Sequence, residues 1–107
     1  TLQQALAVFV DVDDLSGIAV TSAGIADNAR WLGDEETALY LVGAIRALQE
    51  ATGIGVRTVI DATVVEFSDP AAVAALDQAL QLAYQRGWDA PREEWLGRAL
   101  AWEAPDS

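Results

Sequence analysis

The chain contains no histidine, cysteine, methionine or lysine. The lack of histidine and cysteine excludes histidine general bases, thiol nucleophiles and the usual zinc ligands. Without lysine there can be no Schiff base, and without cysteine there can be no disulfide. Any catalysis would therefore have to use carboxylates, hydroxyls, tyrosine, arginine or a metal held by oxygen ligands.

Long apolar runs are also missing. No stretch approaches the ~18 to 20 apolar residues that span a bilayer, and no basic segment precedes an apolar one. We therefore expect neither a membrane segment nor a signal peptide, and a cytoplasmic location. At 107 residues, of which 52% are hydrophobic, the chain can form one domain (1–107) with a core that needs no covalent cross-link.

Positive charge is scarce. Six arginines face 17 acidic residues, which gives a net charge of −11. A field of this sign repels nucleic-acid phosphates and anionic lipids, which argues against both as partners. It favours a metal cation or a basic protein partner, and the alternative is that the charge only keeps the domain soluble.

Two apolar segments have the character of buried strands. The first covers residues 6–12, where five apolar residues are followed by Asp11, Asp13 and Asp14. The second covers residues 56–63, where Val59 and Ile60 are adjacent, as in a strand that is buried on both faces. Residues 18–20 fit either a third strand or a loop.

Capping signals predict the helices. Ser22, Asp34 and the pair Asp69-Pro70 each precede a stretch with helical character, and Gly33, Gly53 and Gly87 follow these stretches. Trp88 and Pro91 then break the chain before a last helical stretch. The predicted helices are 23–32, 35–52, 70–86 and 92–103. In the second of them, Gly43, Ala47 and Ala51 form a stripe of small residues that would let another backbone approach closely.

Strands joined through helices predict parallel pairing with right-handed crossovers. The predicted fold class is therefore α/β, with a short, mainly parallel sheet of two to three strands packed with three to four helices. Such a thin sheet would gain from a second subunit that completes the layer, so we expect a homo-oligomer.

Acidic residues would meet at one edge of that sheet. Asp61 lies near the end of the second predicted strand, as Asp11 and Asp13 lie at the end of the first, and parallel neighbours would bring these carboxylates together. Carboxylate oxygens suit Mg²⁺, and such sites support metal-assisted phosphoryl chemistry. The alternative is that these acids solvate turns, which aspartate favours.

The same residues resemble PIN/NYN-like nucleases. In that family the first strand ends in an aspartate that is followed three residues later by Asn or Asp, as Asp11 and Asp14 are here. V-I-D-A-T at 59–63 and D-P at 69–70 match later elements of some members. The resemblance implies a nuclease fold in which Asp11 holds Mg²⁺, Asp14 orients the site and Asp61 lies nearby. These three would then be the catalytic residues.

The last predicted helix carries an aromatic stripe. Trp95, Ala99 and Trp102 share one face. Exposed tryptophans often carry binding energy at interfaces, so these residues are candidates for a partner-binding surface. The alternative is that they close the core, the commoner fate of large aromatics. For Trp31 and Trp88 we expect positions in the core or at its edge.

The leading functional hypothesis is a non-catalytic acidic protein-interaction module without a cofactor. It would be an accessory subunit, or an antitoxin- or immunity-like inhibitor of a basic partner. The alternative is a Mg²⁺-dependent phosphodiesterase that uses the strand-end carboxylates. A third possibility is small-ligand binding at the strand ends without turnover.

Overall fold

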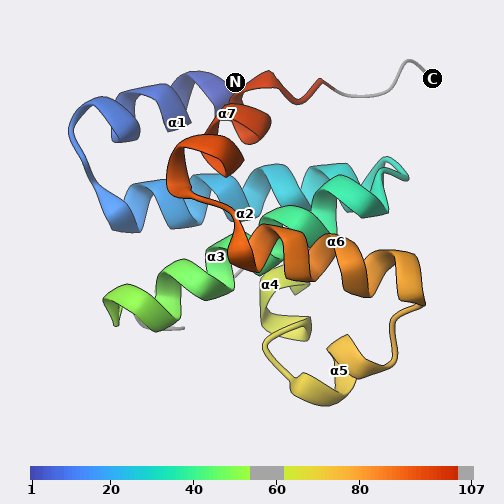
Figure 1. Cartoon of the computed structure of the whole chain (residues 1–107). Helices are drawn as coiled ribbons and strands as arrows, with labels where there is room; N and C mark the ends of the chain where they lie inside the picture. Colours follow the sequence, from blue (N-terminus) through green and yellow to red (C-terminus); the bar gives the residue numbers. More distant parts are fainter. Residues whose placement is uncertain (54–61, 104–107) are drawn as a thin grey trace.

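The computed structural model describes residues 1–53 and 62–103. These residues form seven α-helices and no strand, and 81% of them are helical (Figure 1). The predicted α/β class is therefore wrong, and so is the resemblance to PIN/NYN-like nucleases, because that fold is built on a sheet. The helices are α1 (Leu2–Asp11), α2 (Leu15–Trp31), α3 (Glu35–Thr52), α4 (Ala62–Glu66), α5 (Pro70–Ala74), α6 (Gln78–Asp89) and α7 (Arg92–Ala101).

Helix α3 lies at the centre of the fold. It packs against α2 and, most extensively, against α6, while α1 covers α2 and α7 contacts both α1 and α3 (Figure 1). Most of α3 is buried, including Leu41, Val42 and Ile45, which join Ile18 and Ile25 of α2 in one core. Helix α3 is thus covered mainly by two other helices, α2 and α6.

Helix α1 replaces the first predicted strand. Leu6 is fully buried, and Phe9 and Val10 pack against the same core, which is the i, i+3, i+4 spacing of a helix. A capping box starts the helix, because the Thr1 hydroxyl accepts the backbone N–H of Gln4 at 3.2 Å. The β-branched residues of this apolar run favour a strand, but the spacing of its buried residues is that of a helix.

Helix α2 is longer than predicted and contains residues 18–20. It begins after Asp14, whose side chain accepts the backbone N–H of Gly17 at 3.1 Å. Ser22, the predicted cap, is a buried residue in the middle of the helix. The predicted end is confirmed, because Gly33 follows the last turn with a positive φ of 91°.

Helix α3 has the predicted ends. Asp34 is its N-cap and accepts the backbone N–H of Thr37 at 3.2 Å, and Gly53 ends it in the left-handed conformation with a φ of 70°. The close approach predicted at Gly43 is confirmed as well. A Cβ atom placed on Gly43 would lie 2.0 Å from the backbone oxygen of Tyr84 in α6.

The second half of the chain departs further from the prediction. Most of the predicted second strand lies outside the described residues, and residues 62 and 63 belong to α4. The helix predicted over 70–86 is two helices, because the chain breaks after Ala74 and Asp77 caps α6 anew. Gly87 does not end a helix. It lies buried within α6, where an added Cβ would approach the backbone oxygen of Tyr40 to 1.8 Å.

Candidate functional site

Trp31 is the most exposed large apolar side chain of the described residues, at 89%. It is the last residue of α2, and the buried face of that helix includes Ser22 and Ala29. At 3.6 residues per turn, Trp31 points about 180° away from Ser22 and about 200° away from Ala29. The indole therefore extends from the helix into solvent instead of joining the core.

A hollow of about 320 Å³ lies beside this tryptophan. Its lining comes from α2, α3 and α4 and consists of Asp27, Arg30, Trp31, Glu35 and Thr63. The short turn after Trp31 brings the first turn of α3, and with it Glu35, next to the indole. Asp27 is held in place from the other side, because the Thr63 hydroxyl donates to its Oδ1 at 2.6 Å.

The one arginine in this lining already has a partner. Arg30 forms an ion pair with Glu66, and its guanidinium lies over the ring of Phe67 at 5.1 Å. The hydrogen bond to Glu66 raises the pKa of Arg30, and the same bond lowers the pKa of Glu66. Since these two charges offset each other, Asp27 and Glu35 leave the hollow with a negative charge.

The arrangement suits a cationic group. An exposed indole attracts a guanidinium or ammonium to its face, and adjacent carboxylates add charge-assisted hydrogen bonds. We call Trp31, Asp27 and Glu35 the Trp31 site.

Three of the sequence-predicted aspartates lie at the junction of α1 and α2. Asp11 is the exposed last residue of α1, and Asp14 caps α2. Asp13 occupies the turn with a φ of 53° and lies 3.7 Å from Arg92 of α7. Asp61 lies outside the described residues. Within residues 1–53 and 62–103, no group of three or more acidic side chains could hold a metal ion.

The predicted aromatic stripe of the last helix faces mainly inward. Trp95 is 3% exposed and Ala99 is fully buried, so both belong to the core. Trp102 is half-buried, and its Nε1–H donates to Oδ2 of Asp34 at 3.0 Å. These positions favour the core alternative for the stripe.

The two remaining tryptophans differ from each other. Trp88 is half-buried and stacks on Tyr84 with 6.2 Å between ring centroids, as expected for the edge of a core. The expectation that Trp31 plugs the core was wrong. The angular position of Trp31, opposite the small and apolar residues of the same helix, is the sequence feature that would have indicated its exposure.

Comparison with known proteins gives no relative: no family model matches the chain, and no curated protein or solved structure is detectably similar to it. None of the described helices combines the length and the apolar character needed to cross a bilayer. The function of the chain is therefore inferred from the geometry of its surface.

Proposed function

We propose that the chain is a non-catalytic acidic interaction module that binds a basic segment of a partner protein at the Trp31 site. The observation that carries this proposal is the 89% exposure of Trp31 beside the carboxylates of Asp27 and Glu35. Tryptophan is among the residue types that most often carry binding energy at interfaces.

The chemistry of the site favours a lysine or arginine side chain over an apolar one. A cation over a tryptophan ring contributes about 0.5 to 2 kcal/mol, depending on how far it is desolvated. A tryptophan at the centre of an interface often contributes about 2 kcal/mol or more. The adjacent carboxylates would discriminate against an acidic partner by like-charge repulsion.

The charge of the whole chain supports the same partner. A net charge of −11 steers basic proteins toward the surface and repels acidic ones. Binding of this kind weakens as salt screens the charges. A cytoplasmic accessory subunit and an antitoxin- or immunity-like inhibitor are two forms that this role could take.

Titration with a fluorescent peptide tests the proposal. The probe alternates arginine and lysine with small residues, and a peptide with glutamate at the basic positions is the reference. We expect the basic peptide to bind and the acidic one not to bind. Trp31→Ala should weaken binding at least about tenfold, which corresponds to about 1.4 kcal/mol. Leu82→Ala is the matched control, because it removes an exposed apolar side chain from α6, away from the Trp31 site, and should leave the affinity unchanged.

A second pair of variants separates the site from bulk charge. Glu35 and Glu93 are both exposed acids in the first turn of a helix, but only Glu35 lines the hollow beside Trp31. Glu35→Gln should therefore weaken binding several times more than Glu93→Gln. Equal effects of the two changes would contradict the proposal, and so would unchanged binding by Trp31→Ala or no binding of the basic peptide at millimolar concentration.

A further inference from the structure

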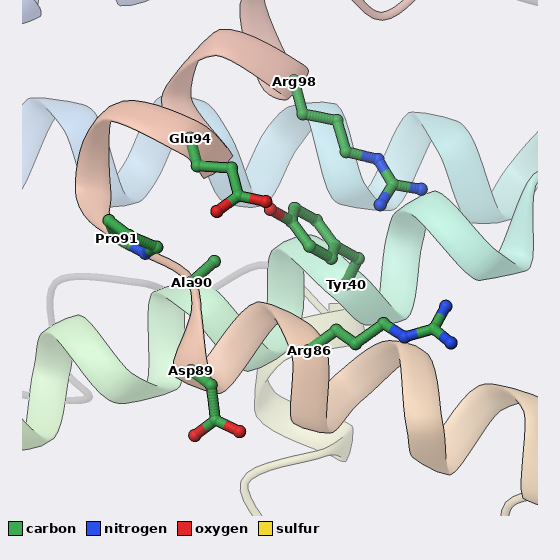
Figure 2. A pocket seen from close by; sticks show the side chains of 7 residues that line it. All are labelled: Tyr40, Arg86, Asp89, Ala90, Pro91, Glu94 and Arg98. Carbon is green, nitrogen blue, oxygen red and sulfur yellow. The ribbon is translucent and has the colours of Figure 1, made fainter.

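We propose that a second hollow, between α3, α6 and α7, binds a small zwitterion of the size of a free amino acid. The hollow has a volume of about 410 Å³ (Figure 2). Its lining consists of Tyr40, Arg86, Asp89, Ala90, Pro91, Glu94 and Arg98. The proposal does not depend on the Trp31 site, because the two hollows have no lining residue in common.

The two arginines of this lining form no ion pair within residues 1–53 and 62–103. Arg98 lies over the ring of Tyr40 at 4.1 Å, and its Nη2 donates to the Thr37 hydroxyl at 3.4 Å. Arg86 is exposed and forms neither an ion pair nor a hydrogen bond with any residue in the described ranges. In a chain with 17 acidic residues, two arginines at one hollow without an ion pair in the described part of the chain are unexpected, and both have donors available for a carboxylate.

Two carboxylates line the same hollow. Figure 2 shows the guanidinium groups of Arg86 and Arg98 on one side of Tyr40 and the carboxylates of Asp89 and Glu94 on the other. Asp89 accepts a hydrogen bond from the Gln85 amide at 3.1 Å, and neither acid forms an ion pair within residues 1–53 and 62–103. Positive and negative groups thus face one cavity without neutralising each other directly.

This separation of charge selects the ligand class. A simple anion would be attracted by the arginines but repelled by Asp89 and Glu94. A simple cation would be attracted by these two acids but repelled by the arginines. A zwitterion satisfies both, with its carboxylate toward Arg86 and Arg98 and its ammonium toward the two acids. The buried ring of Tyr40, which is 4% exposed, forms a fixed floor between the two charged sides.

The ligand must also be small. The volume is at the low end of the range for small-molecule sites, about 300 to 1,000 Å³. Ala90 and Pro91, which join α6 to α7, add an apolar wall where a side chain of the ligand could rest. Free amino acids combine both charges with such a side chain, and a shallow site of this kind would hold them with dissociation constants of about 1 mM.

Nitrogen–proton correlation spectra of the labelled chain test the proposal. Alanine, leucine and phenylalanine are titrated, each beside its amide, which lacks the carboxylate, and its N-acetyl derivative, which lacks the ammonium. We expect at least one free amino acid to shift the resonances of Arg86 to Arg98, and both of its derivatives to bind at least about tenfold more weakly.

Arginine variants locate the binding. Arg86→Gln should weaken binding about tenfold, whereas Arg92→Gln should have no effect, because Arg92, at the start of α7, lies outside the hollow and pairs with Asp13 at 3.7 Å. Arg86 is preferred to Arg98 as the test position, because it is exposed and its replacement should leave the packing intact.

Three results would overturn the proposal. The first is no shift with any of the amino acids at about 10 mM, an excess over the expected dissociation constant. The second is equal binding of the N-acetyl derivative, which would identify a simple anion site. The third is equal weakening by Arg86→Gln and Arg92→Gln, which would show that only the overall charge matters.

Discussion

The crossing of α3 and α6 gives the sharpest test of the fold, through replacement of Gly43 by alanine. The two helices meet backbone to backbone there: a Cβ on Gly43 would lie 2.0 Å from the carbonyl oxygen of Tyr84 and 3.0 Å from the backbone nitrogen of Trp88. Both are main-chain atoms, so no side-chain rotation can relieve the overlap. The helices would have to move apart by about 1 Å along their contact, which opens gaps in a close-packed core.

The magnitude follows from two opposing effects. In the middle of a helix, alanine is more favourable than glycine by about 1 kcal/mol. Overpacking typically costs about 1 to 3 kcal/mol, and the upper end applies here because the clash is with backbone. We expect Gly43→Ala to lower the free energy of unfolding by about 2 kcal/mol, and the midpoint of thermal unfolding by roughly 8 to 16 °C for a domain of this size.

Thermal and urea unfolding followed by circular dichroism give the measurement, and Gly97→Ala is the matched control. Gly97 lies within α7, and an added Cβ would meet nothing within 4 Å, so alanine should raise stability there by up to about 1 kcal/mol. If Gly43→Ala proves as stable as Gly97→Ala, the helices do not cross as closely as the structure shows, and the reasoning fails.

Two further predictions concern the core and the charge network. Leu6→Ala, at a fully buried position, should cost about 2 to 5 kcal/mol of unfolding free energy, whereas Val8→Ala, 60% exposed on the same helix, should stay within about 0.5 kcal/mol of the wild type. Burial alone would raise the pKa of Asp34, but hydrogen bonds from Thr37 and Trp102 outweigh it, so the net pKa lies below its ordinary value of 3.8. Since the folded state then favours the charged form, this stabilisation is present above the unfolded pKa and is lost as pH falls through the lower folded one. Asp34→Asn, which keeps a good cap, should therefore be less stable than the wild type at pH 7 and lose that difference at acid pH in urea titrations; a difference independent of pH would contradict this.

The helix ends could be predicted where a local interaction sets them. Asp34 and Gly53 bound α3 as expected, because a capping carboxylate and a left-handed glycine act within one turn of the chain. The break at Ala75 was missed, although Asp77 is itself a capping residue. Because apolar residues continue along one helical face through residues 70–86, the pattern predicts a single helix and does not indicate the start of α6.

The fold class was wrong for a physical reason. Residues 6–12 combine an apolar run with β-branched side chains, a composition that fits a buried strand or a helix equally well. The choice depends on what covers the segment. Here α2 packs against the helix that contains Leu6, Phe9 and Val10, whereas the capping signal at Ser22 predicts a shorter helix that starts only at residue 23. Because the predicted helix lacks the first turns of α2, the sequence shows no helical partner for residues 6–12, and nothing in it argues against a strand there.

The candidate sites were less predictable than the fold, because they depend on residues that are distant in the chain. The run of Asp11, Asp13 and Asp14 predicts a metal site. In the structure, however, Asp14 caps α2 and Asp13 pairs with Arg92, so local contacts account for two of the three. The tryptophans required knowledge of which helix face is covered. For Trp31 the angular position within its own helix would have been sufficient to indicate exposure, although the expectation from the sequence was the opposite.

The two proposed sites share helix α3 but lie on different faces of it. Glu35 lines the hollow beside Trp31, and Tyr40 forms the floor of the other hollow. Glu35 and Tyr40 are five positions apart in the sequence, which places their side chains about 140° apart around the helix. A ligand in one hollow therefore has no direct contact with the other, and each site provides a control for its counterpart. Trp31→Ala should leave amino-acid binding unchanged, and Arg86→Gln should not weaken binding of the basic peptide. Loss of both activities in either variant would indicate a general loss of structure, so the paired measurements separate a local role of each residue from a structural one.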